Sequence, residues 1–112
     1  MPDSKAELLQ GTLDMLILKA LTQGPVHGYG IARWIQNTTD DQLQIEEGSL
    51  YPALYRMDRR GWIESEWGTS ENNRRAKFYR LTPKGRAQLK EQVAGWQRFV
   101  SVVALILEPQ PV

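Results

Sequence analysis

The chain has 112 residues, of which 41% are hydrophobic and 24% are charged, so it suits one folded domain with a modest core. It contains no cysteine and a single histidine, so we expect no disulfide, no metal site and no cofactor. The N-terminus lacks the pattern of a secretion signal, and the longest uncharged apolar run, at 99–107, is shorter than the roughly 20 residues of a membrane span. We therefore expect a soluble, cytoplasmic protein without a membrane partner.

The net charge of +1 is unevenly distributed along the chain. Residues 48–90 carry ten basic and four acidic side chains, whereas residues 1–47 carry three basic and seven acidic ones. A basic middle in an otherwise acidic chain favours one face that meets a polyanion. The alternative is a solvated basic surface.

The first predicted helix follows a capping box at 4–7, with Ser4 as N-cap and Glu7 three residues later. Its apolar residues are dense enough for burial on more than one side. Residues 22–25, with the sequence TQGP, end this helix. Its leucines at a 4-3 spacing, which we assign to a dimer interface, are Leu9, Leu13 and Leu16.

A second helix is predicted over residues 27–39, with His27 as a hydrogen-bonding residue at its entry. Its two glycines, Gly28 and Gly30, allow another backbone to approach closely. A short extended piece at 43–45, which we expect to be a short strand, follows this helix.

The stretch EEGSLYPALYRMDRRGW, residues 46–62, predicts a third helix with an apolar stripe of Leu50, Leu54 and Met57. Ser49 is its expected N-cap, which places Pro52 in the first turn, where its missing N–H costs little. The opposite side presents Arg56 and Arg59 beside Tyr55, while Arg60 turns back toward the core.

Two strands are predicted at 62–67 and 76–81, joined by a turn-rich segment that is basic at its end. A final helix begins with Thr82 as N-cap and Pro83 as its first residue. It carries a heptad-like stripe of Leu89, Val93, Trp96, Val100, Val103 and Leu107. One small domain cannot bury a terminal helix that is apolar on both sides, so this helix predicts a dimer interface.

This order of elements predicts a mainly α (α+β) fold, a winged helix-turn-helix with a C-terminal dimerisation helix. Residues 1–82 form the winged-helix domain, 83–108 the dimerisation helix and 109–112 a tail. The third helix suits the major groove, and the hairpin suits the flanking backbone or minor groove. The predicted DNA-binding residues are Ser49, Tyr51, Pro52, Tyr55, Arg56 and Arg59 on the helix, with Asn73, Arg74, Arg75 and Lys77 in the hairpin.

Each of these assignments has a plainer alternative. Tyr51 and Tyr55 have apolar bodies that can simply pack. Arg56, the first-ranked contact, has a surface ion pair with Asp58 or another nearby acid as its alternative. Arg80, inside the second strand, is expected to form a surface pair rather than to meet DNA.

Three parts of the chain resemble the PadR family of bacterial transcriptional regulators: GTLDMLILKAL followed by HGYGI, GSLYPAL, and RRAKFYRLTPKG. The resemblance covers roughly residues 8–95. It implies a cytoplasmic homodimer that dimerises through its C-terminal helix and binds double-stranded DNA at a pseudo-palindromic operator. The positions that match the family's motifs are Ser49, Tyr51, Pro52, Tyr55, Arg56, Arg74, Arg75 and Lys77.

Many members of this family are repressors that a small aromatic or lipophilic effector releases from DNA, and this is the function we expect for the chain. The alternative is a winged-helix module that binds a protein without sequence-specific DNA binding. Trp96 then has three interpretations: dimer core, lining of an effector cavity between subunits, or packing on its own domain. With one histidine and no cysteine, no catalytic constellation can be built, so we do not expect an enzyme.

Overall fold

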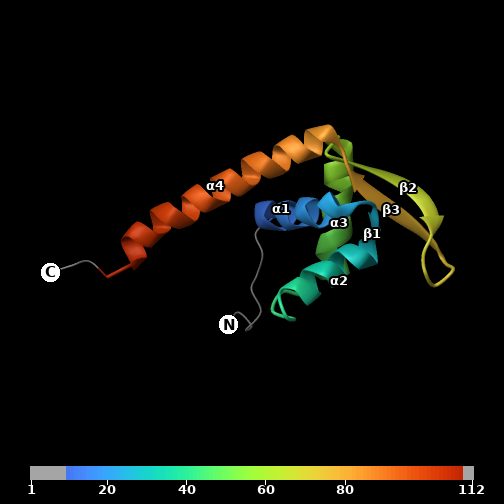
Figure 1. Ribbon diagram of the computed structural model, residues 1–112, viewed down its shortest axis with the longest axis horizontal. Helices are drawn as coiled ribbons and strands as arrows, with labels where there is room; N and C mark the ends of the chain where they lie inside the picture. The colour runs from blue at the N-terminus through green and yellow to red at the C-terminus, as the bar shows by residue number, and fades with distance from the viewer. Residues whose placement is uncertain (1–9, 110–112) are drawn as a thin grey trace.

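The structure, a computed structural model, describes residues 10–109. Over these residues the helices are α1 (Gln10–Ala20), a short 3-10 turn (Leu21–Gln23), α2 (Gly28–Thr38), α3 (Glu47–Arg59) and α4 (Pro83–Leu107). The strands are β1 (Val26–His27), β2 (Ile63–Thr69) and β3 (Arg75–Leu81). Helices α1, α2 and α3 form the body, the β2–β3 hairpin projects from one side of it, and α4 extends from it as a long arm (Figure 1).

The three strands form one antiparallel sheet in the order β1-β3-β2. Val26 pairs with Tyr79 across β1 and β3, and Trp67 pairs with Lys77 across β2 and β3. A helix-turn-helix of α2 and α3 followed by a two-stranded hairpin is the arrangement of a winged helix. The predicted winged-helix fold class is therefore confirmed, while dimerisation through α4 stays a prediction.

The core lies where α1, α2 and α3 meet the base of the hairpin. The predicted stripe of α3 is buried, as apolar side chains at a helical spacing of three to four residues should be. Burial of one such side chain stabilises the fold by about 1.5–3 kcal/mol. The largest fully buried side chains of the described residues are Ile17, Leu18, Leu21, Ile31, Leu50, Leu54, Met57 and Ile63.

Two helix starts agree with the sequence. Thr82 caps α4, because its Oγ1 accepts a hydrogen bond from the Gly85 N–H at 3.0 Å, and Pro83 is the first helical residue. His27 caps α2, because its Nδ1 accepts from the Gly30 N–H at 2.9 Å. Gly85 also lies so close to the Trp62 carbonyl that a Cβ would collide with it, which ties the start of α4 to the hairpin.

Two local predictions were wrong. Helix α3 starts at Glu47 with Glu46 as N-cap, so Pro52 is the sixth helical residue and not part of the first turn. The proline removes one donor to the Gly48 carbonyl, which is tolerated because Gly48 is exposed to water. Residues 43–45 form no strand; the third strand is β1, which precedes α2. The capping box at 4–7 and Leu9 lie outside the described residues.

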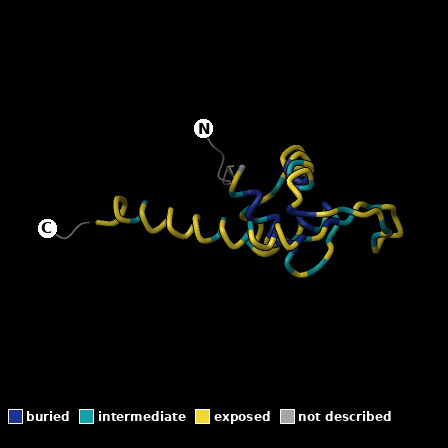
Figure 2. The backbone as a smooth tube through the Cα atoms, turned by 90° about the horizontal axis from the view of Figure 1, so that it is seen from above, coloured by how far each residue is buried: buried dark blue, intermediate teal, exposed yellow. Residues whose placement is uncertain are grey.

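The α4 arm is exposed along most of its length (Figure 2). The helix contacts α1, and Leu89 in its first half packs against the core, while its second half extends beyond the body (Figure 1). Among residues 10–109, no helix is long and apolar enough to cross a membrane.

Candidate nucleic-acid interface

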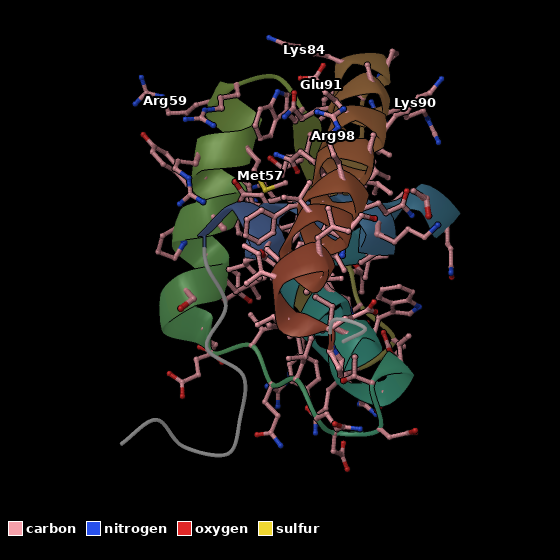
Figure 3. The ribbon with its side chains drawn as sticks, turned by 90° about the vertical axis from the view of Figure 1, so that its left-hand side faces the viewer. Met57, Arg59, Lys84, Lys90, Glu91 and Arg98 are labelled. Atoms are coloured by element: carbon pink, nitrogen blue, oxygen red, sulfur yellow. The ribbon has the colours of Figure 1, made fainter. Side chains whose placement is uncertain are left out.

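Helix α3 separates its two faces as the sequence predicts. Met57 points into the body and Arg59 points away from it (Figure 3). The predicted DNA-binding residues Ser49, Tyr51, Pro52, Tyr55 and Arg59 are all exposed. This outer face is therefore polar and aromatic, with hydroxyl and guanidinium groups that suit phosphates and base edges.

Tyr55 and Arg59 are neighbours on this face. The Arg59 guanidinium carbon lies 5.7 Å from the centre of the Tyr55 ring, and Arg59 Nη1 lies 3.5 Å from the tyrosine hydroxyl oxygen. The two side chains support each other at the surface, so they present one combined group rather than two independent ones.

Arg56 was predicted to point outward, but in the structure it turns toward α1. Its Nη2 donates to Asp14 Oδ1 at 2.9 Å, and the side chains of Arg56 and Asp14 are 30% and 5% exposed. The orientation was wrong because Arg56 sits at the edge of the buried stripe, where an acid from α1 reaches it. The alternative of an ion pair describes this contact, although the partner is Asp14 and not Asp58, which accepts from Ser65 Oγ at 3.2 Å.

Burial raises the pKa of the Asp14 carboxyl, although the adjacent Arg56 pulls that pKa down. Arg56 Nε is also buried, without a hydrogen-bond partner among the described residues. The pair therefore joins α1 to α3, and the Arg56 guanidinium is less available to DNA than that of Arg59. Arg60 turns back as expected, since its guanidinium carbon lies 5.2 Å from the ring centre of the buried Trp62.

Tyr51 has a mixed position. Tyr51 is 42% exposed, and its ring lies against Gly28, where an added Cβ would come within 2.8 Å of the tyrosine hydroxyl. Burial and the nearby Glu47 raise the pKa of the Tyr51 phenol. The sequence predicted that Gly28 admits another backbone; in the structure it admits the Tyr51 side chain of α3 instead. This close contact packs α2 against α3.

The tip of the hairpin is a tight turn, in which Ser70 N–H donates to the Arg74 carbonyl at 2.8 Å and Asn73 adopts a φ of 59°. Asn73, Arg74, Arg75 and Lys77 are all exposed there. Glu71 lies 3.5 Å from His27 Nε2, and its pKa is lowered by its own backbone N–H and by His27. The predicted basic groups are thus displayed on one projecting element (Figure 1).

Two residues beside these groups were missed in the sequence. In the sequence, Asp14 is an isolated acid in an apolar helix, and Trp67 is an aromatic residue at the end of a predicted strand. The alternation of β2 against β3 could have placed Trp67 beside Lys77, but no local signal paired Asp14 with Arg56. Arg80 forms the predicted surface pair, at 2.7 Å from Glu64.

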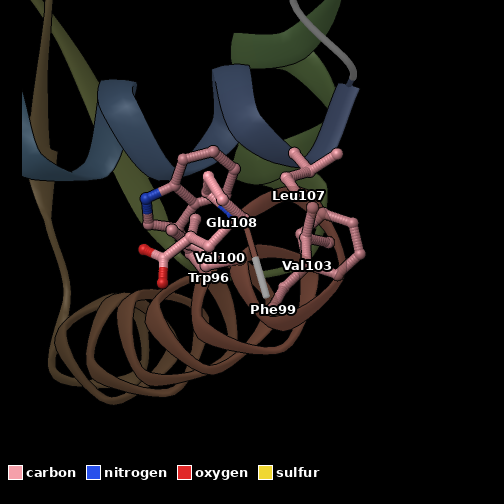
Figure 4. Close-up of a pocket in the computed structure, with 8 residues that line it drawn as sticks. Trp96, Phe99, Val100, Val103, Leu107 and Glu108 are labelled. Atoms are coloured by element: carbon pink, nitrogen blue, oxygen red, sulfur yellow. The ribbon is translucent and has the colours of Figure 1, made fainter. Parts of the chain in front are cut away.

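The second half of α4 carries an apolar groove of about 490 Å³. Trp96, Phe99, Val100, Val103 and Leu107 line it on one side of the helix (Figure 4). Trp96, Val100 and Leu107 are exposed, whereas Leu89 and Val93 are partly buried. The groove is thus the part of the predicted stripe that the described body leaves open.

The predicted interface residues of α1 lie differently. Leu13 is buried in the core of its own chain, and Leu16 is packed against that core. Assigning Leu13 to a surface that a partner covers was therefore wrong, because the periodicity of a helix that is apolar on several sides does not separate core from interface.

Comparison with known proteins points to a family of DNA-binding regulators, in agreement with the winged-helix geometry. Residues 17–91 match the model of the transcriptional regulator PadR-like family. A transcriptional regulator of Mycobacterium tuberculosis is 31% identical over 86 residues, which are 76% of each chain.

Two solved structures are similar over most of their length. A transcriptional regulator from Clostridium thermocellum has a TM-score of 0.81 and 32% identity, covering 88% of this chain and 96% of its own. A PadR-like transcriptional regulator from Bacillus cereus has a TM-score of 0.76 and 30% identity, and the match covers 94% of this chain and 100% of its own. The chain therefore belongs to the PadR-like family of transcriptional regulators, which bind DNA through a winged helix and are not enzymes.

Proposed function

We propose that the chain is a homodimeric, sequence-specific repressor that a small aromatic or lipophilic effector releases from its operator. The observation that carries the DNA-binding part is the outer face of α3, where Tyr55 and Arg59 stand exposed opposite a fully buried stripe. A major groove about 12 Å wide admits such a helix. Ser49, Tyr51 and Pro52 extend the same face toward the N-terminal end of α3.

The hairpin supports this orientation. Asn73, Arg74, Arg75 and Lys77 lie on an element that projects beside α3, so they suit the phosphates that flank the groove. Arg56 belongs to this interface through the ion pair that steadies α3, and we place it after Arg59 as a direct contact.

The groove on α4 supports the dimer and the effector. Exposed apolar side chains on an arm that leaves the body are typical of a surface covered by a second copy. A volume of about 490 Å³ falls within the range of about 300–1,000 Å³ of ligand pockets. The effector's chemical class and the repressor role come from the family resemblance. A regulator of bacterial DNA works in the cytoplasm, which is the location we propose.

The test begins with a random pool of duplex DNA, from which the protein should enrich a two-fold-related sequence at low salt. Each α3 would take one half-site, with the half-sites about 34 Å apart or a multiple of that. If no sequence is enriched, the alternative of a protein-interaction module gains support.

Variants then test the proposed face on the enriched fragment. Arg59→Ala and Tyr55→Phe should weaken binding in a gel-shift assay, by about tenfold for the arginine. Lys90→Ala is the matched control, because Lys90 lies on α4 and points away from Arg59 (Figure 3). Equal affinity of the Arg59 variant and the parent would remove α3 as the contact helix.

A further inference from the structure

Trp67 is the exposed aromatic residue of the hairpin. It lies on β2 toward the tip, its residue surface is 56% exposed, and it is not part of the core cluster. The Trp67 indole therefore adds little to core packing, and its ring faces are open to contacts on the surface of the hairpin.

The register of the hairpin shows which side chains share its face. Trp67 pairs with Lys77, and Thr69 pairs with Arg75. Residues directly opposite in an antiparallel pair lie on one face, and residues two apart along a strand return to it. Trp67, Lys77 and Arg75 therefore stand on the same side of the hairpin.

This side adjoins α3. Ile63 and Tyr79 occupy the same face at the base of the hairpin and are buried in the core. Ser65, which pairs with Tyr79 and lies two residues before Trp67 on β2, donates from its hydroxyl to Asp58 of α3 at 3.2 Å. The face that carries Trp67 thus continues from the contact with α3 outward to the tip.

Both cations on this face lie over the indole. The Arg75 guanidinium carbon is 4.6 Å from the centre of the Trp67 rings, and Lys77 Nζ is 5.9 Å from it. Among the described residues, neither cation forms an ion pair. The opposite face carries Glu64, which pairs with Arg80. The unpaired cations Arg75 and Lys77 therefore lie on the Trp67 face of the hairpin, and the ion-paired Arg80 lies on the opposite face.

We propose that Trp67 is a positioning residue for DNA binding, whose indole holds Arg75 and Lys77 in place to meet the DNA backbone beside α3. A long side chain that is already held loses less conformational freedom when it binds, and a cation over a ring face keeps its other side open to a phosphate. The inference rests on the proposed DNA-binding function and adds a residue to it.

The test measures affinity for the enriched operator by fluorescence anisotropy. Trp67→Leu keeps apolar bulk without a ring face, and Trp67→Phe keeps a smaller ring. We expect Trp67→Leu to bind about tenfold more weakly and Trp67→Phe to recover most of that loss. Thermal unfolding of both variants should match that of the parent, and Arg80→Ala on the opposite face is the control.

A double-mutant cycle separates positioning from direct stacking of the indole on DNA. In a chain that already carries Arg75→Ala and Lys77→Ala, the further change Trp67→Leu should alter affinity by less than about twofold, because the indole then has no cation to hold. An undiminished tenfold loss in that background, or a Trp67→Leu variant that binds like the parent, would overturn the inference. If the parent itself binds no DNA, the proposed function fails, and this inference fails with it.

Discussion

Arg56 and Arg59 lie three residues apart on α3, yet their guanidinium groups point to different surroundings. Arg59 is exposed beside Tyr55, whereas Arg56 binds a carboxylate that is almost fully buried. Removing one member of a buried ion pair leaves the other uncompensated, which costs more than the pair contributes when intact. Arg56 therefore affects stability more directly than it affects recognition.

We expect Arg56→Ala to lower the free energy of unfolding at pH 7 by about 2 kcal/mol, less than for a fully buried pair because Arg56 is partly exposed. Asp14→Asn should cost less, because an amide oxygen still accepts from Arg56. Urea unfolding at one fixed protein concentration measures both changes. If the Arg56 variant is as stable as the parent, the ion pair does not hold the Arg56 guanidinium, which is then available as a direct DNA contact.

The raised pKa of Asp14 also predicts a pH dependence. The folded chain keeps this proton to a higher pH than the unfolded chain, whose pKa is near 3.8. The contribution of Asp14 to stability is therefore greatest below that value and decreases as the pH rises through the folded-state pKa. The free energy of unfolding of the parent minus that of Asp14→Asn, measured between pH 3 and 7, isolates the contribution of Asp14. If this free-energy difference increases with pH, the raised pKa of Asp14 is contradicted.

At the scale of elements, the join between the hairpin and α4 depends on one close approach. Gly85 has no room for a Cβ beside the Trp62 carbonyl, whereas Gly95, further along α4, has nothing within 4 Å. A change from glycine to alanine therefore meets a crowded site at Gly85 and an open site at Gly95.

Gly85→Ala should lower the free energy of unfolding by about 1–3 kcal/mol, because the backbone must shift to admit the methyl group. Gly95→Ala should raise it by about 0.5–1 kcal/mol, because alanine favours the helix and meets no neighbour within the chain. Thermal unfolding at matched concentration compares the two. Equal effects of the two changes would show that the approach of α4 to the hairpin is not tight.

The hairpin is the second element whose charges can be tested as a group. Replacing both Arg74 and Arg75 with alanine should weaken binding to all DNA sequences alike and reduce the slope of log affinity against log salt by roughly 2. A salt titration measures this slope, with Arg80→Ala as control because Arg80 is paired on the other face. An unchanged slope would mean that the hairpin does not reach phosphates.

At the scale of the whole molecule, the α4 arm extends far beyond the body, and the longest dimension of the chain is 62 Å. The groove on this arm exposes Trp96 and Phe99 to water in a single chain. Two such arms packed together would bury these side chains and set the distance between the two α3 helices.

Light scattering at micromolar concentration should accordingly give twice the chain mass of 12.8 kDa. Val103→Glu should shift the mass toward that of one chain, because it places a charge inside the groove. Ala94→Glu is the matched control, since helical spacing puts it on the far side of α4. A monomeric parent would contradict the dimer and leave the groove to another partner.

Local patterns were enough to predict the buried stripe of Leu50, Leu54 and Met57, the two hairpin strands and the Thr82 cap, because each depends on residues within a few positions of one another. The Arg56–Asp14 pair joins residues from α3 and α1, and β1 pairs with a strand some fifty residues later. Helical periodicity says which side of α3 is buried, but it does not say which acid from another helix meets an arginine at the edge of that side. For the same reason Leu13 belongs to the core and Trp96 to an open groove, although both occupy apolar stripes: burial depends on what the fold brings opposite each stripe.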